Sequence, residues 1–183
     1  MVKQCLGKYF FVHPLSYILP IASGVSFDRV VFGLANNETE FTARLLINLG
    51  FKRALVVAGR DNDGKHFDEI SNLGKTKITE IEEGKYKIYE IEPKDFDLKK
   101  GVNTEISQGK NVKENADIFR CILNGKEKGP KRDIVLINSG ALIYISGIAN
   151  SIAEGMELAK KSIDEGRALN TLNCFLKVYK KYE

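Results

Sequence analysis

A strand–helix–strand pattern near the start of the chain constrains its fold more than any other feature. Two short apolar runs, Val30–Leu34 and Ala54–Ala58, have the length and continuous hydrophobicity of strands buried on both faces. The segment between them has a helix-start cap (Asn37, Glu40), an apolar stripe (Phe41, Leu45, Leu46, Leu49) and a stop (Gly50). Because adjacent parallel strands need such a crossover, the pattern predicts an α/β fold.

The rest of the chain predicts a hairpin and three more helices. Residues 77–81 and 86–91 alternate apolar and polar side chains, and Glu83-Gly84 between them has the composition of a turn. Caps at Asn111 and Ser151, with apolar residues at helical spacing, predict helices near residues 111–125 and 151–163, and apolar spacing alone predicts a helix near 169–179.

A third buried strand is expected at Ile134–Ile137, after the break at Gly129-Pro130. The small residues of Asn138–Ala141 would then follow at its carboxyl end, where a ligand or a helix start could approach closely. At 183 residues the chain is long enough for one core and too short for two ordinary domains. We therefore expect a single α/β domain over residues 1–183, with a mostly parallel central sheet flanked by helices and an antiparallel hairpin near 77–91.

Two adjacent carboxylates, Asp68 and Glu69, form the candidate site. They follow the buried strand Ala54–Ala58, and open α/β sheets bind ligands beyond the carboxyl ends of their strands. Mg²⁺ prefers one or two carboxylates and completes its shell with water and substrate phosphates. The pair therefore predicts a phosphate substrate bridged by Mg²⁺. The alternative is a solvated turn with two surface acids.

The loop before this pair, Gly59–His66, nearly matches two known motifs. It has the glycine and lysine spacing of a P-loop, but His66 stands where Ser or Thr should hold Mg²⁺, and two aspartates add negative charge where phosphates would lie. As a calcium loop it lacks acids at its first and twelfth positions, Gly59 and Ile70. Neither motif is predicted. His13 and His66 also lack the sequence context of acyl-transfer chemistry.

Composition excludes several functional classes. The net charge of +4 comes from 28 basic and 24 acidic residues spread along the chain, so no clustered basic face predicts nucleic-acid binding. Three widely separated cysteines indicate neither a disulfide framework nor a zinc site, and they fit a reducing, cytoplasmic location. Charged residues and prolines interrupt the apolar tract Tyr9–Ala22, which is also too short to span a bilayer. We therefore expect neither a secretory signal nor a membrane segment.

An ordered series of strings over residues 30 to 170 resembles the carboxyl-terminal α/β part of anthranilate phosphoribosyltransferase. The strings are Asn48–Val57, Asp68–Ser71, Gly74 with Thr76, Pro93–Phe96, Glu114–Ala116, Arg132-Asp133 with Asn138, and Glu154-Gly155 with Ala159. Related pyrimidine nucleoside phosphorylases share the architecture but match these strings less well. The resemblance thus implies the α/β domain of this glycosyltransferase family.

The resemblance also implies an activity. Enzymes of this family transfer the ribosyl-phosphate group of phosphoribosyl pyrophosphate to anthranilate, a step of tryptophan biosynthesis. In the family an adjacent Asp-Glu pair binds the Mg²⁺ on the diphosphate, and the resemblance implies this role for Asp68 and Glu69. Lys3 stands where the family has an arginine for the anthranilate carboxylate, and lysine keeps the charge but lacks the bidentate fork. The reaction needs no protein nucleophile, so no catalytic residue is assigned.

The chain also departs from the family. The helical amino-terminal domain with its Gly-Thr-Gly-Gly-Asp phosphate loop is missing from it, the segment after Gly7 is eroded, and Asp61–Lys65 is an insertion. We therefore expect a helical-domain partner or self-association, with residues 1–24 as an interface or hinge and Tyr9–Ala22 as the exposed apolar face. Two alternatives remain open: a descendant that no longer catalyses and serves as a binding or regulatory partner, and a free-standing metal- or nucleotide-binding module that uses Gly59–Glu69.

Overall fold

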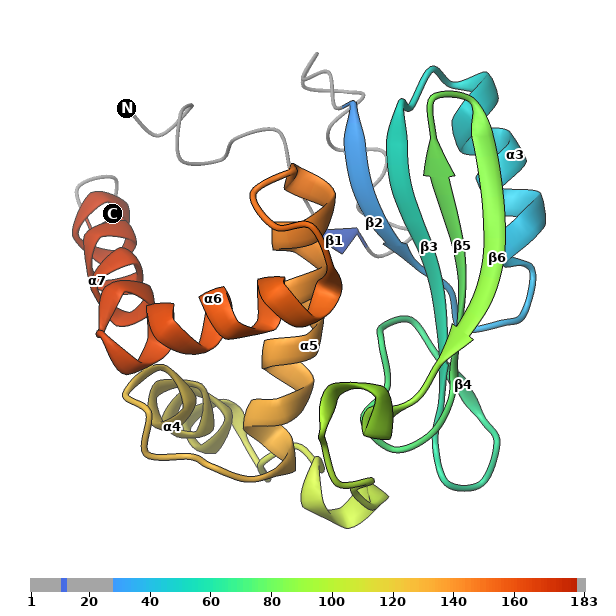
Figure 1. Ribbon diagram of the computed structural model, residues 1–183. Coiled ribbons are helices and arrows are strands. Elements are labelled where there is room, and N and C mark those ends of the chain that lie inside the picture. The colour runs from blue at the N-terminus through green and yellow to red at the C-terminus, as the bar shows by residue number, and fades with distance from the viewer. Residues whose placement is uncertain (1–10, 13–27, 181–183) are drawn as a thin grey trace.

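The protein, described here from a computed structural model over residues 11–12 and 28–180, is built on a mixed sheet with helices on both faces (Figure 1). The described strands run in the order β1-β2-β3-β5-β6, with β4 also paired to β3. The β1–β2 and β2–β3 pairs are parallel, and the β3–β4, β3–β5 and β5–β6 pairs are antiparallel. The strands are β1 (Phe11–Val12), β2 (Arg29–Gly33), β3 (Arg53–Arg60), β4 (His66–Phe67), β5 (Thr76–Glu82) and β6 (Lys85–Ile91).

The helices divide between the two faces of the sheet. Helix α3 (Thr39–Asn48) packs on one face over β3 and β5, and α5 (Pro130–Ser146) packs on the other face against β2 and β3. Helix α6 (Ile152–Asp164) lies on α5, and α4 (Val112–Leu123) and α7 (Arg167–Tyr179) lie farther from the sheet (Figure 1). This arrangement confirms the predicted α/β class. Two short 3₁₀ helices, Pro93–Phe96 and Asn103–Glu105, lie between β6 and α4.

Strand β3 is the centre of the core, because its side chains are buried on both faces. Leu55 and Val57 belong to the cluster that includes α5, whereas Ala54, Val56 and Ala58 belong to the cluster that includes α3. A strand covered on both sides needs apolar residues at every position. This explains the unbroken run in the sequence and confirms the strand predicted there.

The predicted third strand, Ile134–Ile137, is wrong, because this segment lies in the first half of α5. Pro130 occupies the first turn of that helix, where its fixed φ and missing N–H are tolerated. The buried positions that follow recur at helical spacing: Leu136, Ile137, Gly140, Ala141 and Ile145. A four-residue apolar run cannot distinguish a buried strand from a buried helix. The parallel part of the described sheet is therefore limited to β1, β2 and β3.

The predicted hairpin is confirmed. Strands β5 and β6 pair antiparallel from Thr76↔Ile91 to Glu82↔Lys85. The two turn residues, Glu83 and Gly84, both have positive φ, 45° and 77°, as the right-handed twist of a tight hairpin requires.

Two of the three predicted helix caps are confirmed. The side chains of Asn111 and Ser151 accept hydrogen bonds from the backbone N–H groups of Glu114 and Glu154. The cap predicted at Asn37 is wrong, because α3 begins two residues later, after Glu38, whose side chain makes no capping hydrogen bond.

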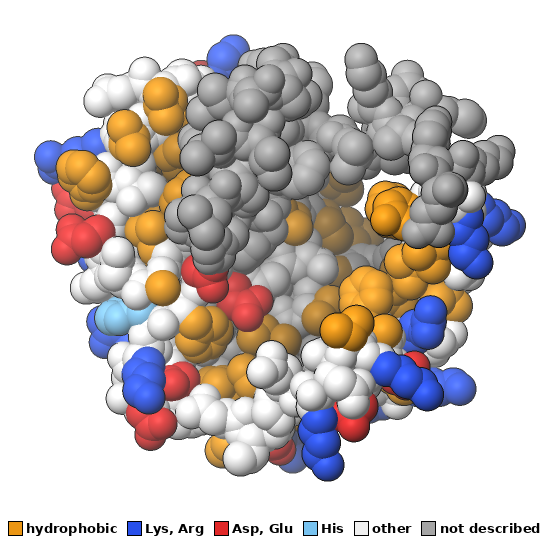
Figure 2. Space-filling view, turned by 180° about the vertical axis from the view of Figure 1, so that it is seen from behind, with side chains coloured by type: hydrophobic (Ala, Val, Ile, Leu, Met, Phe, Trp, Pro, Cys, Tyr) orange, Lys and Arg blue, Asp and Glu red, His pale blue; other side chains and the backbone are white. Residues whose placement is uncertain are grey.

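Helix α3 turns a different face to the sheet than its apolar stripe predicted. Phe41, Leu45 and Leu49 are 69%, 50% and 55% exposed, and only Leu46 of the stripe is buried. Small residues make the close contact instead. Ala43 is fully buried, and the Thr79 hydroxyl on β5 donates to the Thr39 hydroxyl at 2.9 Å. Hydrophobic side chains accordingly reach the surface in several places on the face seen in Figure 2.

The amino-terminal predictions fall mostly outside the described residues. Of the tract Tyr9–Ala22, only Phe11–Val12 is described, as strand β1 beside β2. The interface role of residues 1–24 and the exposed apolar face at Tyr9–Ala22 therefore stay predictions. Within the described part of the chain, none of the helices has the length and hydrophobicity needed to cross a bilayer.

Two glycines let α5 and α6 approach each other closely. A Cβ at Gly155 would overlap the carbonyl oxygen of Gly140, and a Cβ at Gly140 would lie 2.7 Å from the backbone nitrogen of Met156 and 2.8 Å from the carbonyl oxygen of Ile152. Backbone therefore packs on backbone at this crossing, and α6 cannot accept a side chain here without moving.

We expect Gly155→Ala to destabilise the fold by about 1–3 kcal/mol, the usual cost of overpacking, despite the better helix propensity of alanine. Chemical denaturation measures the change. The matched control is Gly129→Ala, because a Cβ there meets only the flexible Glu127 carboxylate, at 3.1 Å. That variant should lose less than about 1 kcal/mol, typical of a helix-cap change. Equal stability losses would contradict the close-packing argument.

Candidate functional site

The acidic pair lies over the carboxyl ends of the parallel strands β2 and β3, as predicted. It follows β4 and begins the loop that leads to β5. Gly33 ends β2, and a Cβ on it would overlap the carbonyl oxygen of Asp68. Gly59, near the end of β3, makes the same close approach to the carbonyl oxygen of Glu69. The backbone of the pair therefore rests directly on the strand ends.

Buried hydrogen bonds hold the loop after the pair. Ile70 N–H donates to Asn138 Oδ1, and Asn138 Nδ2 donates back to the Ile70 carbonyl, both at 2.9 Å. Ser71 N–H donates to Thr76 Oγ1 at 2.8 Å, and Ser71 Oγ donates to the Arg60 carbonyl at 2.6 Å. The pair is thus part of an ordered loop whose anchors come from α5, β3 and β5.

The loop Asp61–Lys65 is also tied to the fold. Asn62 Nδ2 donates to the carbonyls of Leu73 and Gly101, both at 3.2 Å. The Asp61 carboxylate accepts from the backbone N–H groups of Asp63 and Lys65 within the loop. This loop therefore packs against the segment that follows the acidic pair.

Burial and repulsion act on Glu69. Asp68 and Glu69 are both half-buried. Desolvation raises the pKa of the Glu69 carboxyl to about 7, and the negative charge of Asp68 adds to the shift. A carboxylate held in this state is stabilised by a cation that restores its lost solvation. Binding a cation is the chemistry that this arrangement favours.

Two adjacent carboxylates fit a Mg²⁺ site better than a metal site made of protein ligands alone. Among residues 11–12 and 28–180, no group of three or more His, Cys, Asp or Glu side chains could hold a metal. Structural zinc sites need four protein ligands, whereas Mg²⁺ is held by one or two carboxylates together with water and phosphate oxygens. Asp68 and Glu69 are two adjacent carboxylates of the kind that such a site uses.

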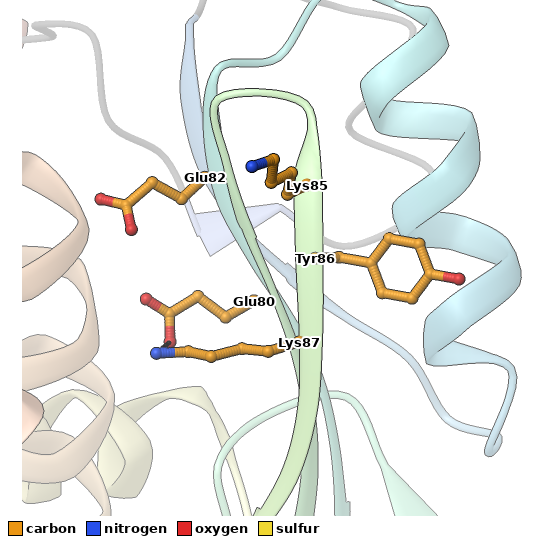
Figure 3. Close-up of a pocket in the computed structure, with 5 residues that line it drawn as sticks. All are labelled: Glu80, Glu82, Lys85, Tyr86 and Lys87. Atoms are coloured by element: carbon orange, nitrogen blue, oxygen red, sulfur yellow. Dashed lines mark ion pairs between the residues drawn. The ribbon is translucent and has the colours of Figure 1, made fainter.

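A second polar cluster lines a hollow of about 330 Å³ at the other end of β5 (Figure 3). Its central residue, Glu80, is 3% exposed, accepts hydrogen bonds from the hydroxyls of Tyr89 at 2.8 Å and Tyr144 at 2.5 Å, and pairs with Lys87 at 3.2 Å. Burial, reinforced by the charge of Glu80, raises the pKa of Tyr89. This carboxylate is already compensated, so the cluster ties the hairpin to α5 and offers little to a ligand.

The structure thus brings together Asp68 and Glu69, while Lys3 lies outside the described residues. Sequence reasoning missed two further parts of the site. The first is Gly33, whose place at a strand end is a signal for close backbone approach. The second is Asn138, which the sequence pattern places after a strand but which reaches the loop from the middle of α5.

Comparison with known proteins shows the family of the chain. Residues 16–169 match the family described as "Glycosyl transferase family, a/b domain". The anthranilate phosphoribosyltransferase of Acetivibrio thermocellus is 41% identical over 158 residues, which cover 86% of this chain and 44% of the relative. That of Methanobrevibacter smithii is 44% identical over 132 residues, 72% of this chain and 38% of the relative.

Solved structures of anthranilate phosphoribosyltransferases are similar to this chain in fold. Anthranilate phosphoribosyltransferase from Thermus thermophilus superposes with a TM-score of 0.74 at 31% identity, covering 86% of this chain and 45% of that one. The Saccharomyces cerevisiae enzyme in complex with PRPP and Mg superposes with a TM-score of 0.67 at 27% identity, covering 82% and 41%. This chain spans less than half the length of these relatives. Because the family match covers most of its residues, the chain belongs to the glycosyl transferase family, through its a/b domain.

Proposed function

We propose that this chain is the metal-binding α/β half of an anthranilate phosphoribosyltransferase. In this role it binds the diphosphate of phosphoribosyl pyrophosphate through Mg²⁺ on Asp68 and Glu69, and it transfers phosphoribosyl to anthranilate together with a helical half. The observation that carries the proposal is the half-buried acidic pair on the glycine ends of β2 and β3. The S. cerevisiae relative in complex with PRPP and Mg supports the choice of ligands.

The reaction explains why two carboxylates suffice. The bond between ribose C1 and the diphosphate oxygen breaks, a bond from C1 to the anthranilate nitrogen forms, and that nitrogen releases a proton to the departing diphosphate or to water. Bound Mg²⁺ would neutralise the negative charge that develops on the departing diphosphate. Asp68 and Glu69 hold the cation, and the backbone contacts at Gly33 and Gly59 fix where they hold it.

The remaining contacts are proposed to come from outside the described residues. Lys3 would approach the anthranilate carboxylate, and a helical-domain polypeptide would cradle the phosphates. A cytoplasmic location suits a biosynthetic enzyme of this kind.

A non-catalytic descendant is the second candidate. The lysine at position 3, where the family has an arginine, and the loop Asp61–Lys65 favour it, because both depart from the family pattern while Asp68 and Glu69 persist. Such a protein would bind Mg²⁺ with diphosphate and would not turn over.

Calorimetric titration of the full chain with inorganic pyrophosphate tests the metal site. We expect pyrophosphate binding to depend on Mg²⁺. Asp68→Asn and Glu69→Gln should each weaken this binding about 10- to 100-fold, the range for losing one charge-assisted contact. Asp117→Asn and Glu157→Gln, at exposed positions of α4 and α6, are the matched controls. Unchanged affinity in both site variants would contradict the assignment.

A turnover assay separates the two candidate functions. The chain is mixed with the part of the A. thermocellus relative that it does not cover, and phosphoribosyl transfer to anthranilate is followed. We expect product only when both parts are present, and none with Asp68→Asn. Mg²⁺-dependent pyrophosphate binding without any turnover would favour the non-catalytic candidate.

Ionisation of Glu69 should cost stability in the absence of metal. Its pKa is raised from 4.5 to about 7 on folding, so the folded protein holds a proton that the unfolded chain has lost between these pH values. Stability therefore falls as pH rises through this window. Glu69→Gln removes the effect. We expect it to be more stable than the wild type by on the order of 1–3 kcal/mol at pH 8, with little difference at pH 4.

Chemical denaturation at both pH values in the presence of a chelator measures this difference. Glu157→Gln, an exposed change of the same type, should show no such pH dependence. A Glu69→Gln variant that is less stable than the wild type at pH 8 would show that the carboxylate is compensated after all.

A further inference from the structure

The side chain of Asn138 on α5 holds the backbone of the residue that follows the acidic pair. Its Oδ1 accepts from Ile70 N–H, and its Nδ2 donates to the Ile70 carbonyl, each at 2.9 Å. Nδ2 also donates to the carbonyl of Ile134, one turn earlier on the same helix, at 2.9 Å. Asn138 is 8% exposed and Ile70 is fully buried, so water does not readily replace these bonds.

This contact takes the place of a strand partner. Ile70 lies between β4 and β5, outside the regular ladder. An asparagine amide presents one donor and one acceptor side by side, the same pair that a neighbouring strand would offer. Asn138 therefore fixes the peptide groups on both sides of Ile70, and one of these groups begins at Glu69.

The third hydrogen bond, to the Ile134 carbonyl, fixes the orientation of the Asn138 side-chain amide. It uses the Nδ2 hydrogen that Ile70 leaves free, so the orientation of the amide is fixed by its own helix. The loop is then clamped between the glycine ends of β2 and β3 on one side and α5 on the other. Asp68 and Glu69 lie next to this clamp.

We propose that Asn138 is a positioning residue for the metal site. By fixing the Ile70 backbone it holds the carboxylates of Asp68 and Glu69 in the arrangement that accepts Mg²⁺ with diphosphate. The proposal rests on the function proposed above and adds that a helix far along the chain sets the metal affinity. Groups that support metal ligands in this way typically change affinity 10- to 100-fold when they are removed.

Calorimetry with Mg²⁺ and inorganic pyrophosphate tests the role in the full chain. Asn138→Ala removes all three hydrogen bonds and should raise the dissociation constant about 10- to 100-fold. Asn138→Asp keeps the size and the acceptor for Ile70 N–H but loses the donor to the carbonyls of Ile70 and Ile134, and it should weaken binding less. Each titration is run well below the unfolding transition of the variant, and Asn138→Asp decides the question if Asn138→Ala does not fold.

Tyr144→Phe is the matched control for lost stability. Tyr144 lies on the same helix, and its hydroxyl donates to Glu80 at the end of β5 away from the acidic pair. This variant should lose stability in chemical denaturation and keep the wild-type dissociation constant. A purely structural role of Asn138 would make its variants behave in the same way.

The outcomes separate the two proposals. Wild-type binding that Asn138→Ala and Asn138→Asp leave unchanged would overturn the positioning role and leave the proposed function intact. A wild-type chain that gives no Mg²⁺-dependent heat with pyrophosphate would contradict the proposed metal site, and the positioning role with it. Weaker binding in the Asn138 variants, together with a wild-type dissociation constant in Tyr144→Phe, supports both proposals.

Discussion

The close contact between the acidic loop and two glycines is the constraint on which the site depends. A side chain at Gly33 or Gly59 would occupy the space of the carbonyl oxygens of Asp68 and Glu69. A strand can carry a peptide segment directly across its carboxyl end where a glycine at or near that end leaves room for the backbone. The parallel pair β2 and β3 thus determines where the carboxylates lie, and Asn138 and Ser71 hold the segment in place.

Features with local causes could be predicted from the sequence. The burial of β3, the hairpin turn at Glu83-Gly84 and the caps at Asn111 and Ser151 each depend on residues within a few positions of one another. The placement of Asp68-Glu69 beyond a buried strand also follows from a short stretch of chain. For these features, local hydrophobic pattern and turn chemistry are sufficient.

Features that depend on distant contacts could not be predicted. Ile134–Ile137 is helical because Pro130 starts a helix whose next buried residues lie beyond the run. The face of α3 is set by Thr39 and Ala43 against β5, so its apolar stripe points outward except at Leu46. Asn138 reaches a backbone group 68 positions earlier in the chain, and no local pattern indicates that contact.

Two buried glutamates show how site and scaffold differ in this fold. Glu80 receives two tyrosine hydroxyls and a lysine, so its charge is compensated within the protein. Glu69 lies half-buried beside another acid, and among the described residues nothing offsets the desolvation that raises its pKa. Scaffold packing alone gives no benefit from an uncompensated carboxylate. A bound cation would compensate this carboxylate, which is why the pair is proposed as a metal site rather than as part of the scaffold.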